Sequence, residues 1–368
     1  MWNSPDPAEF RLNNFGALRL GLAALVVVAH SFVAANGSNE GAPLYDLTGK
    51  RLDLGALAVN GFFIASGFMV SESLARGRGF VDFLRKRLLR LYPAFVLLWL
   101  LQSFLLAPLF SEASFSGYSA RQSGILLFNL ATLSSYGYPY GGLLRVFPEN
   151  PVPGELNVSL WTLRYEFGCY VFLGLAGVAG IFRRRWLVTG LFGGMWLILA
   201  LGIRLPWHRV LTALLADGAH WPRFAAYFLA GAAFWQWRKE IPRHRGLAAG
   251  ALALMAASFL KPAWIDWVLP VGWTYLLMWL AYLPAPGLRP IGVRTDVSYG
   301  AYLYAFPIQQ MIMVLLPKAT AWVVVALSLP AALVAGLVSW HLVEKHFVGR
   351  SSNTPRSVGK PDQDSRQS

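Results

Sequence analysis

Residues 18–32, LRLGLAALVVVAHSF, decide the fold class. Ten apolar residues separate Arg19 from His30, and the apolar run continues beyond both until it can cross a hydrocarbon core of about 30 Å as a helix. On such a helix, a spacing of eleven residues is about 16 Å of rise and returns to within about 20° of the starting direction. The stretch therefore predicts a membrane helix with two ionisable side chains on one stripe.

These two side chains have a structural and a functional interpretation. In the structural one, Arg19 anchors the helix at the cytoplasmic surface and His30 forms a hydrogen bond between helices. In the functional one, both belong to a site, because ionisable groups inside a membrane are costly and mark chemistry or transport.

Apolar runs of similar length recur along the 368 residues of the chain. Hydrophobic residues make up 56% and charged residues only 14%, against about 25% charged in soluble proteins. We expect an all-α integral membrane protein with about ten transmembrane helices, near residues 15–36, 54–75, 91–110, 158–182, 186–203, 222–237, 246–260, 267–284, 298–316 and 320–342. Clusters of Arg and Lys fall on alternate connections between these spans, which predicts that the N-terminus and the C-terminus are cytoplasmic.

The same clusters account for the formal net charge of +14, so nucleic acid is not expected as a partner. Cys169 is the only cysteine and the histidines lack ligand spacing, so neither a disulfide nor a metal site is expected. We expect residues 1–347 to form one transmembrane domain. Residues 348–368 are polar and rich in Pro and Ser, which predicts a disordered cytoplasmic tail.

A carboxylate enters the fourth predicted span from the outer side. Within SLWTLRYEF, at 159–167, Glu166 lies at a depth comparable to that of His30. A pair between the two would orient the imidazole and raise its basicity, as a general base requires. The alternative is a structural pair between Glu166 and Arg164, although residues two apart on a helix point in different directions.

Two further segments suggest how a ligand is held. In the second predicted span, FFIASG places Ser66 next to Gly67, and small residues allow a neighbouring helix or a thin ligand to approach the backbone. Downstream, RKRLLRLYP places Arg87 and Arg90 three residues apart on one helical face at the cytoplasmic edge. Their guanidinium groups suit a phosphate, which they bind bidentately, or the headgroup of an anionic lipid.

The arginines are expected at the cytoplasmic edge and His30 deeper in the membrane. These positions favour a donor with a phosphate-rich head on the arginines and a thin arm that reaches the histidine. Acyl-coenzyme A has that shape. His30 would then deprotonate an acceptor hydroxyl from the outer side, or carry the acyl group transiently. One alternative is a transporter or flippase in which His30, Glu166 and Arg19 form a proton or substrate path. Another is a structural membrane protein, but this alternative gives the buried His30 and Glu166 no role.

Six segments occur in order along residues 13–347: Arg19 with His30, FFIASG at 62–67, RLLRLYP at 87–93, SLWTLRYEF at 159–167, VSYGAYLYAFP at 297–307 and SWHLVEKHF at 339–347. This set resembles the motifs of the membrane acyltransferase type 3 family, the O-acyltransferases that modify bacterial envelope glycans. The resemblance implies an O-acetyltransferase that moves an acyl group from cytoplasmic acyl-coenzyme A, usually acetyl-coenzyme A, to a hydroxyl of a cell-surface or exported glycan. It implies no metal.

The resemblance also implies roles for particular residues. The catalytic residues would be His30 and Glu166. The donor would be held by Arg19, Arg87, Arg90, Phe63, Ser66 and Gly67. The acceptor would be held by Trp161 and Tyr302. The implied location is the bacterial cytoplasmic (inner) membrane, crossed many times, with membrane lipid and other polysaccharide-assembly proteins as further partners.

The chain departs from the family pattern at two positions. Gly16 stands where many members have an acidic residue, and Ala305 where many have histidine. We also expect no counterpart of the outer esterase-like domain that is fused to many relatives. We therefore expect this chain to complete the transfer itself or to pass the acyl group to a separate partner.

Overall fold

The computed structural model describes residues 13–77, 79–111, 127–133, 146–204, 217–293 and 295–348. Helices and loops make up these residues, and within them the only β-type pairing is one isolated bridge between Ser111 and Val146. The all-α prediction is confirmed. The tail predicted at 348–368 lies outside the described residues, apart from Val348.

Ten helices of sixteen residues or more are present in the described part of the chain, and each overlaps one of the predicted spans. They are α2 (Phe15–Asn36), α3 (Leu54–Arg76), α4 (Phe80–Leu101), α7 (Leu163–Val178), α8 (Arg185–Ala200), α10 (Trp221–Trp237), α11 (Arg245–Leu260), α12 (Ile265–Ala281), α13 (Ser298–Leu315) and α14 (Ala321–Ser339).

The length of the helices and their exposed apolar side chains are typical of a membrane protein. Within the described residues, four segments are long and apolar enough to cross a membrane: Phe15–Asn36, Leu54–Arg76, Phe80–Phe110 and Ala321–Val348. Large apolar side chains such as Val178, Trp186 and Leu260 are about two-thirds exposed, at 69%, 67% and 71%. Surfaces of this kind mark contact with lipid or with a partner rather than with water. Ten crossings and cytoplasmic termini stay predictions.

The third helix begins earlier than the sequence pattern predicts. The expected span was 91–110, but α4 starts at Phe80 and continues through η1, a π-helical turn at Gln102–Leu106, into α5 (Ala107–Phe110). An ion pair between Lys86 Nζ and Asp82 Oδ2, at 2.8 Å and four residues apart, supports its first turns. The basic segment is therefore the start of a helix and not a connecting loop.

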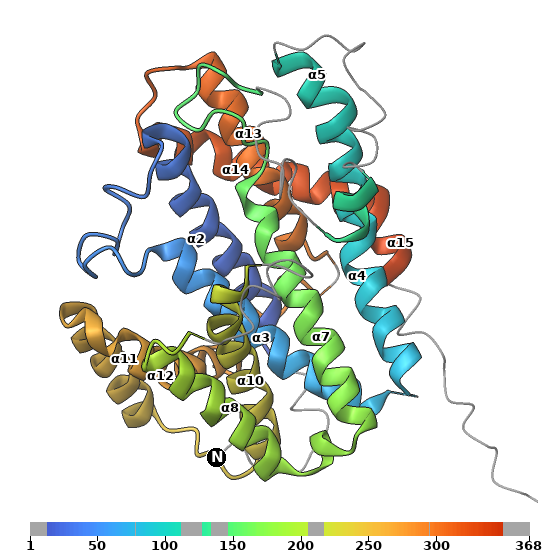
Figure 1. Cartoon of the computed structure of the whole chain (residues 1–368), viewed down its shortest axis with the longest axis vertical. Helices are drawn as coiled ribbons and strands as arrows, with labels where there is room; N and C mark the ends of the chain where they lie inside the picture. The colour runs from blue at the N-terminus through green and yellow to red at the C-terminus, as the bar shows by residue number, and fades with distance from the viewer. Residues whose placement is uncertain are drawn as a thin grey trace, which may run out of the picture.

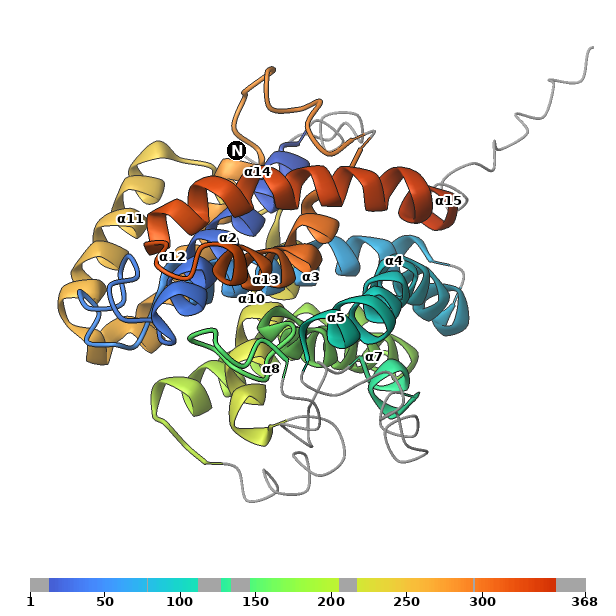
Figure 2. The same cartoon turned by 90° about the horizontal axis from the view of Figure 1, so that it is seen from above.

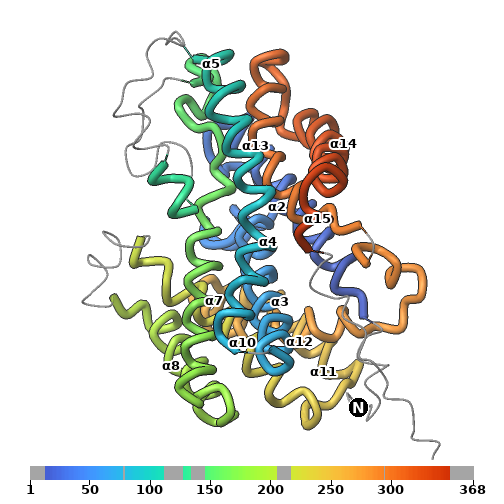
Figure 3. The backbone as a smooth tube through the Cα atoms, turned by 90° about the vertical axis from the view of Figure 1, so that its right-hand side faces the viewer, coloured from blue at the N-terminus to red at the C-terminus, as the bar shows by residue number. Residues whose placement is uncertain are grey.

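The helices fall into two groups that meet at α3. On one side, α13 packs between α2 and α14, and α14 continues through η7 (Trp340–Glu344) into α15 (Lys345–Val348) as one long rod (Figure 2). On the other side, α8, α10, α11 and α12 gather at the lower end of the molecule (Figure 1). α4 and α7 run side by side along one flank (Figure 3). Segments far apart in sequence thus surround the middle of α2 and α3.

The closest approach of α3 to α10 depends on two glycines. A Cβ on Gly67 would overlap the backbone carbonyl oxygen of Phe228, and a Cβ on Gly231 would overlap that of Ile64. Small residues at a helix crossing allow the two backbones to approach in this way. Of the two interpretations of the small pair in FFIASG, the structure therefore assigns helix packing to Gly67.

Replacing Gly67 by alanine should destabilise the protein, because the added methyl group meets backbone rather than a movable side chain. We expect a loss of about 1–3 kcal/mol, the usual cost of overpacking a core. The measurement is thermal unfolding of the detergent-purified protein by circular dichroism. Gly193→Ala on α8 is the matched control, since its Cβ would enter open space. Equal melting temperatures for the two variants would contradict the packing argument.

Candidate active site

A cavity of about 360 Å³ lies between α2, α3, α4, α7 and α13. Seven of the ten predicted site residues line it: Arg19, Phe63, Ser66, Arg87, Arg90, Glu166 and Tyr302. These residues come from five helices that span most of the chain. The structure therefore brings most of the predicted site together, whereas His30, Gly67 and Trp161 are not part of the cavity wall.

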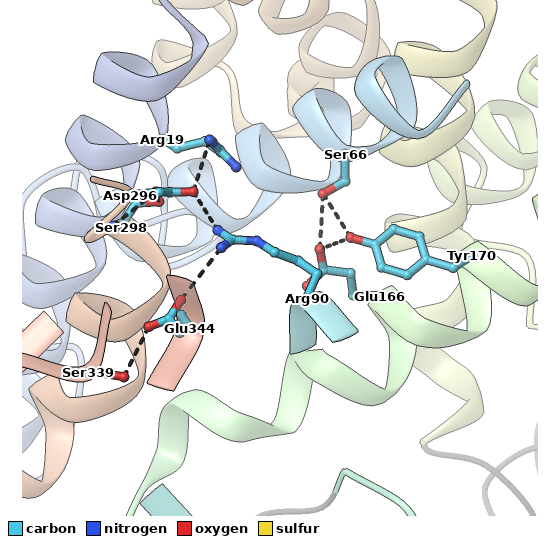
Figure 4. Close-up of polar contacts among 9 residues, drawn as sticks. All are labelled: Arg19, Ser66, Arg90, Glu166, Tyr170, Asp296, Ser298, Ser339 and Glu344. Carbon is cyan, nitrogen blue, oxygen red and sulfur yellow. Dashed lines mark hydrogen bonds and ion pairs between the residues drawn. The ribbon is translucent and has the colours of Figure 1, made fainter. Parts of the chain in front are cut away.

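Two arginines in the cavity share one carboxylate (Figure 4). The Oδ2 atom of Asp296 lies 3.0 Å from Arg19 Nη2 and 2.6 Å from Arg90 Nη2. Ser298 donates its hydroxyl to Asp296 Oδ1 at 2.6 Å. On its other side, Arg90 Nη1 lies 3.5 Å from Glu344 Oε2. One carboxylate thus joins α2, α4 and the start of α13, and Glu344 adds η7 to the network.

Asp296 was not among the predicted residues. It stands in the loop before α13 and is 6% exposed. Burial opposes its ionisation, but the guanidinium groups of Arg90 and Arg19 outweigh burial and hold the pKa of the carboxyl at about 2. Asp296 is therefore a fixed negative charge at neutral pH. The sequence pattern that could have indicated Asp296 is an isolated acidic residue two positions before Ser298, the first residue of a predicted helix.

Arg87 differs from the other two arginines. Its Nη2 donates to the Ser73 hydroxyl at 3.2 Å, and no carboxylate among the described residues lies within ion-pair distance of it. The Nε atoms of Arg87 and Arg19 are buried without a hydrogen-bond partner. Buried donors without partners cost free energy. The arginine side of the cavity therefore has donors to spare for an anionic group, and guanidinium geometry suits phosphate.

The Glu166 carboxylate is held by two hydroxyls on the cavity wall (Figure 4). Ser66 Oγ donates to Glu166 Oε1 at 3.0 Å, and the Tyr170 hydroxyl donates to the same oxygen. Tyr170 also lies within 3.4 Å of Ser66 Oγ. Tyr170 was missed from the sequence, although it follows Glu166 by four residues and hence one helical turn.

His30 does not contact Glu166. Its Nδ1 lies 3.1 Å from Ser159 Oγ, and its ring meets the ring of Phe306 edge to face. The predicted pair of imidazole and carboxylate is therefore wrong, because Ser66 and Tyr170 occupy the carboxylate instead. The two residues also differ in depth, because Glu166 is bonded to Ser66, twelve residues into α3, whereas His30 is six residues from the end of α2.

A short segment connects His30 to the cavity. The segment is η3 (Val158–Thr162), which holds Ser159 beside His30. The Tyr302 hydroxyl donates to the Ser159 carbonyl, so its other partner, the Thr162 hydroxyl at 2.7 Å, must donate to it. Tyr302 and Thr162 both line the cavity. His30 therefore lies just beyond the end of the cavity that these two hydroxyls form.

Trp161 packs away from the cavity. The centroid of its ring lies 4.9 Å from that of His220 and 5.4 Å from that of Phe224.

Cys169 is a buried free thiol on α7. The described His, Cys, Asp and Glu side chains do not form a group that could hold a metal ion.

Comparison with known proteins identifies the family. A family model described as an acyltransferase domain matches residues 12–341. The chain belongs to the membrane acyltransferase type 3 family. It is 28% identical to an O-acetyl transferase of Shigella phage Sf6 over 92% of this chain and 97% of the relative. It is 24% identical to nodulation protein 10 of Rhizobium leguminosarum bv. viciae over 64% of this chain and 53% of that protein. No solved structure matches.

Family membership decides between the alternatives for the activity of the protein. The chain is an acyltransferase and a membrane protein, so the transporter and the purely structural alternatives are set aside. An acyltransferase requires an acyl donor and an acceptor.

Replacing Asp296 by asparagine should destabilise the protein, because two partly buried guanidinium groups then lose their shared, buried counter-charge. Removing one partner of a buried ion pair costs about 3 kcal/mol. The measurement is thermal unfolding of the purified protein near pH 7, with the exposed Asp46→Asn as control.

The difference between wild type and Asp296→Asn should also depend on pH. The native pKa of about 2 is below the usual value of about 3.9 for an unfolded chain. The stabilisation is therefore fully present above about pH 4 and is lost as the pH falls toward 2. A difference in melting temperature that grows on acidification would contradict this assignment.

Proposed function

We propose that the chain is a membrane O-acyltransferase that moves an acyl group, acetyl in the first instance, from cytoplasmic acyl-coenzyme A to a hydroxyl of a cell-surface or exported glycan. The supporting observation is that one cavity is lined both by arginines with unpartnered donors and by Ser66 with Glu166. The name of the phage relative, an O-acetyl transferase, supports the ester product. The proposed location is the bacterial cytoplasmic membrane.

The donor binds with its phosphates on the arginine side. Arg87 and Arg90 lie in the first half of α4, and in the predicted topology the N-terminal end of this helix is cytoplasmic. The phosphates of coenzyme A satisfy the free donors of Arg87 and Arg19, and the thin pantetheine arm follows the apolar wall at Phe62 and Phe63. The thioester then lies near Ser66.

His30 serves the acceptor from the outer side. When its Nδ1 donates to Ser159, its Nε2 keeps a lone pair and can take the proton of an acceptor hydroxyl. The position of His30 beyond the Tyr302 end of the cavity suits an acceptor that approaches from the side opposite to the donor phosphates.

Replacing Arg87 by glutamine should weaken acetyl-coenzyme A binding by roughly 10- to 100-fold, because a hydrogen bond between charged groups contributes about 1.5–3 kcal/mol. Equilibrium dialysis of the detergent-purified protein measures the dissociation constant. Arg185→Gln is the control, since Arg185 is an exposed arginine paired with Glu240. Unchanged affinity in Arg87→Gln together with loss of a co-purified anionic lipid would show that Arg87 binds a lipid headgroup instead.

Replacing His30 by alanine should abolish O-acylation in the host. Proton NMR of envelope and secreted glycans before and after mild base measures the ester content in the parent, in a deletion strain, and in the deletion strain complemented with His30→Ala. The exposed His346→Ala should restore the ester signal, and immunoblotting should show equal amounts of both variants in the membrane. Identical spectra from parent and deletion strains would rule out a glycan acceptor.

A further inference from the structure

Ser66 has the surroundings of a nucleophile. It lies in the middle of α3, is 8% exposed, and lines the cavity beside the arginines. Its Oγ donates to Glu166 Oε1 at 3.0 Å, and the Tyr170 hydroxyl donates to the same carboxylate oxygen. A hydroxyl bonded to a base that a third group orients is the arrangement that activates serine for covalent catalysis.

The position of Ser66 along its helix also separates it from His30. Ser66 is twelve residues from the start of α3, which is about 18 Å, whereas His30 is six residues from the end of α2, which is about 9 Å. Because the connection between α2 and α3 places those two ends on the same side, Ser66 lies deeper from that side than His30 does. The donor cavity thus reaches Ser66 but not the imidazole.

We propose that Ser66 carries the acyl group as an ester between the two half-reactions, with Glu166 as its general base and Tyr170 as the residue that positions Glu166. This inference depends on the proposed function, because it requires acyl-coenzyme A as donor. It assigns to Ser66 the carrier role that was left open for His30.

In the first half-reaction, Glu166 takes the proton of Ser66 while Oγ attacks the thioester carbonyl carbon. The bond from carbon to oxygen forms, the bond from carbon to sulfur breaks, and coenzyme A leaves as a thiolate. Three arginines line the cavity and favour an anionic leaving group. The thiolate then takes a proton from cytoplasmic water, and Glu166 keeps the proton of Ser66.

In the second half-reaction, His30 takes the proton of the acceptor hydroxyl, and the acceptor oxygen attacks the acyl carbon of the Ser66 ester. The ester bond to Ser66 breaks, Glu166 returns its proton to Oγ, and His30 releases its proton on the outer side. Serine, glutamate and histidine all return to their starting states.

The test is to trap the acyl-enzyme. Full-length purified protein is mixed with radiolabelled acetyl-coenzyme A in the absence of acceptor, quenched in acid, digested, and mapped by tandem mass spectrometry. We expect acetyl on the peptide that contains Ser66, none in Ser66→Ala, and normal labelling in Ser71→Ala, a buried serine on the same helix outside the cavity wall. Glu166→Gln should slow the release of coenzyme A on the order of 100-fold.

A second variant distinguishes loss of the nucleophile from misfolding of the protein. Ser66→Cys should be labelled at the same position as a thioester that neutral hydroxylamine releases. Label on His30, or wild-type turnover in a Ser66→Ala protein that binds acetyl-coenzyme A normally, would overturn the acyl-serine and leave the proposed function standing. A wild-type protein that neither binds nor cleaves acetyl-coenzyme A would overturn both.

Discussion

The site depends on one buried carboxylate between two partly buried guanidinium groups. Uncompensated charge in a low-dielectric interior costs several kcal/mol, so Arg19 and Arg90 can share a cavity only with Asp296 between them. The same contacts fix α2, α4 and the start of α13 relative to one another, and Glu344 adds η7. Among the described residues the arrangement leaves Arg87 without a carboxylate at ion-pair distance, and this guanidinium group suits the cavity to a phosphate-bearing donor.

The fold was largely predictable because hydrophobic length alone marks a membrane helix. All ten predicted spans correspond to helices, and Arg87 and Arg90 face one cavity as their spacing indicates. The start of α4 was not predictable in the same way. Its first turns are basic and were assigned to a loop, whereas the Asp82–Lys86 pair and the helical spacing of the arginines hold them in the helix.

The partners of the polar residues were harder to predict than the helices that carry them. Position along one helix follows from residue number, but the depth of one helix relative to another and the direction in which a side chain meets it depend on tertiary packing. Glu166 therefore pairs with Ser66 and Tyr170 rather than with His30. Packing also accounts for the departures from the family pattern. A Cβ at Gly16 would overlap the backbone at Ile291, and Ala305 is fully buried in an apolar cluster.

Transfer in two steps separates a donor and an acceptor that approach from opposite sides of a membrane. A direct transfer would require the coenzyme A arm and the acceptor hydroxyl at the acyl carbon at the same time, and the cavity would then be open at both ends. The structure places hydroxyls of Tyr302 and Thr162 between the donor cavity and His30. An acyl group on Ser66 is small enough to be reached from that end after coenzyme A has left, so transfer in two steps requires no continuous opening through the protein.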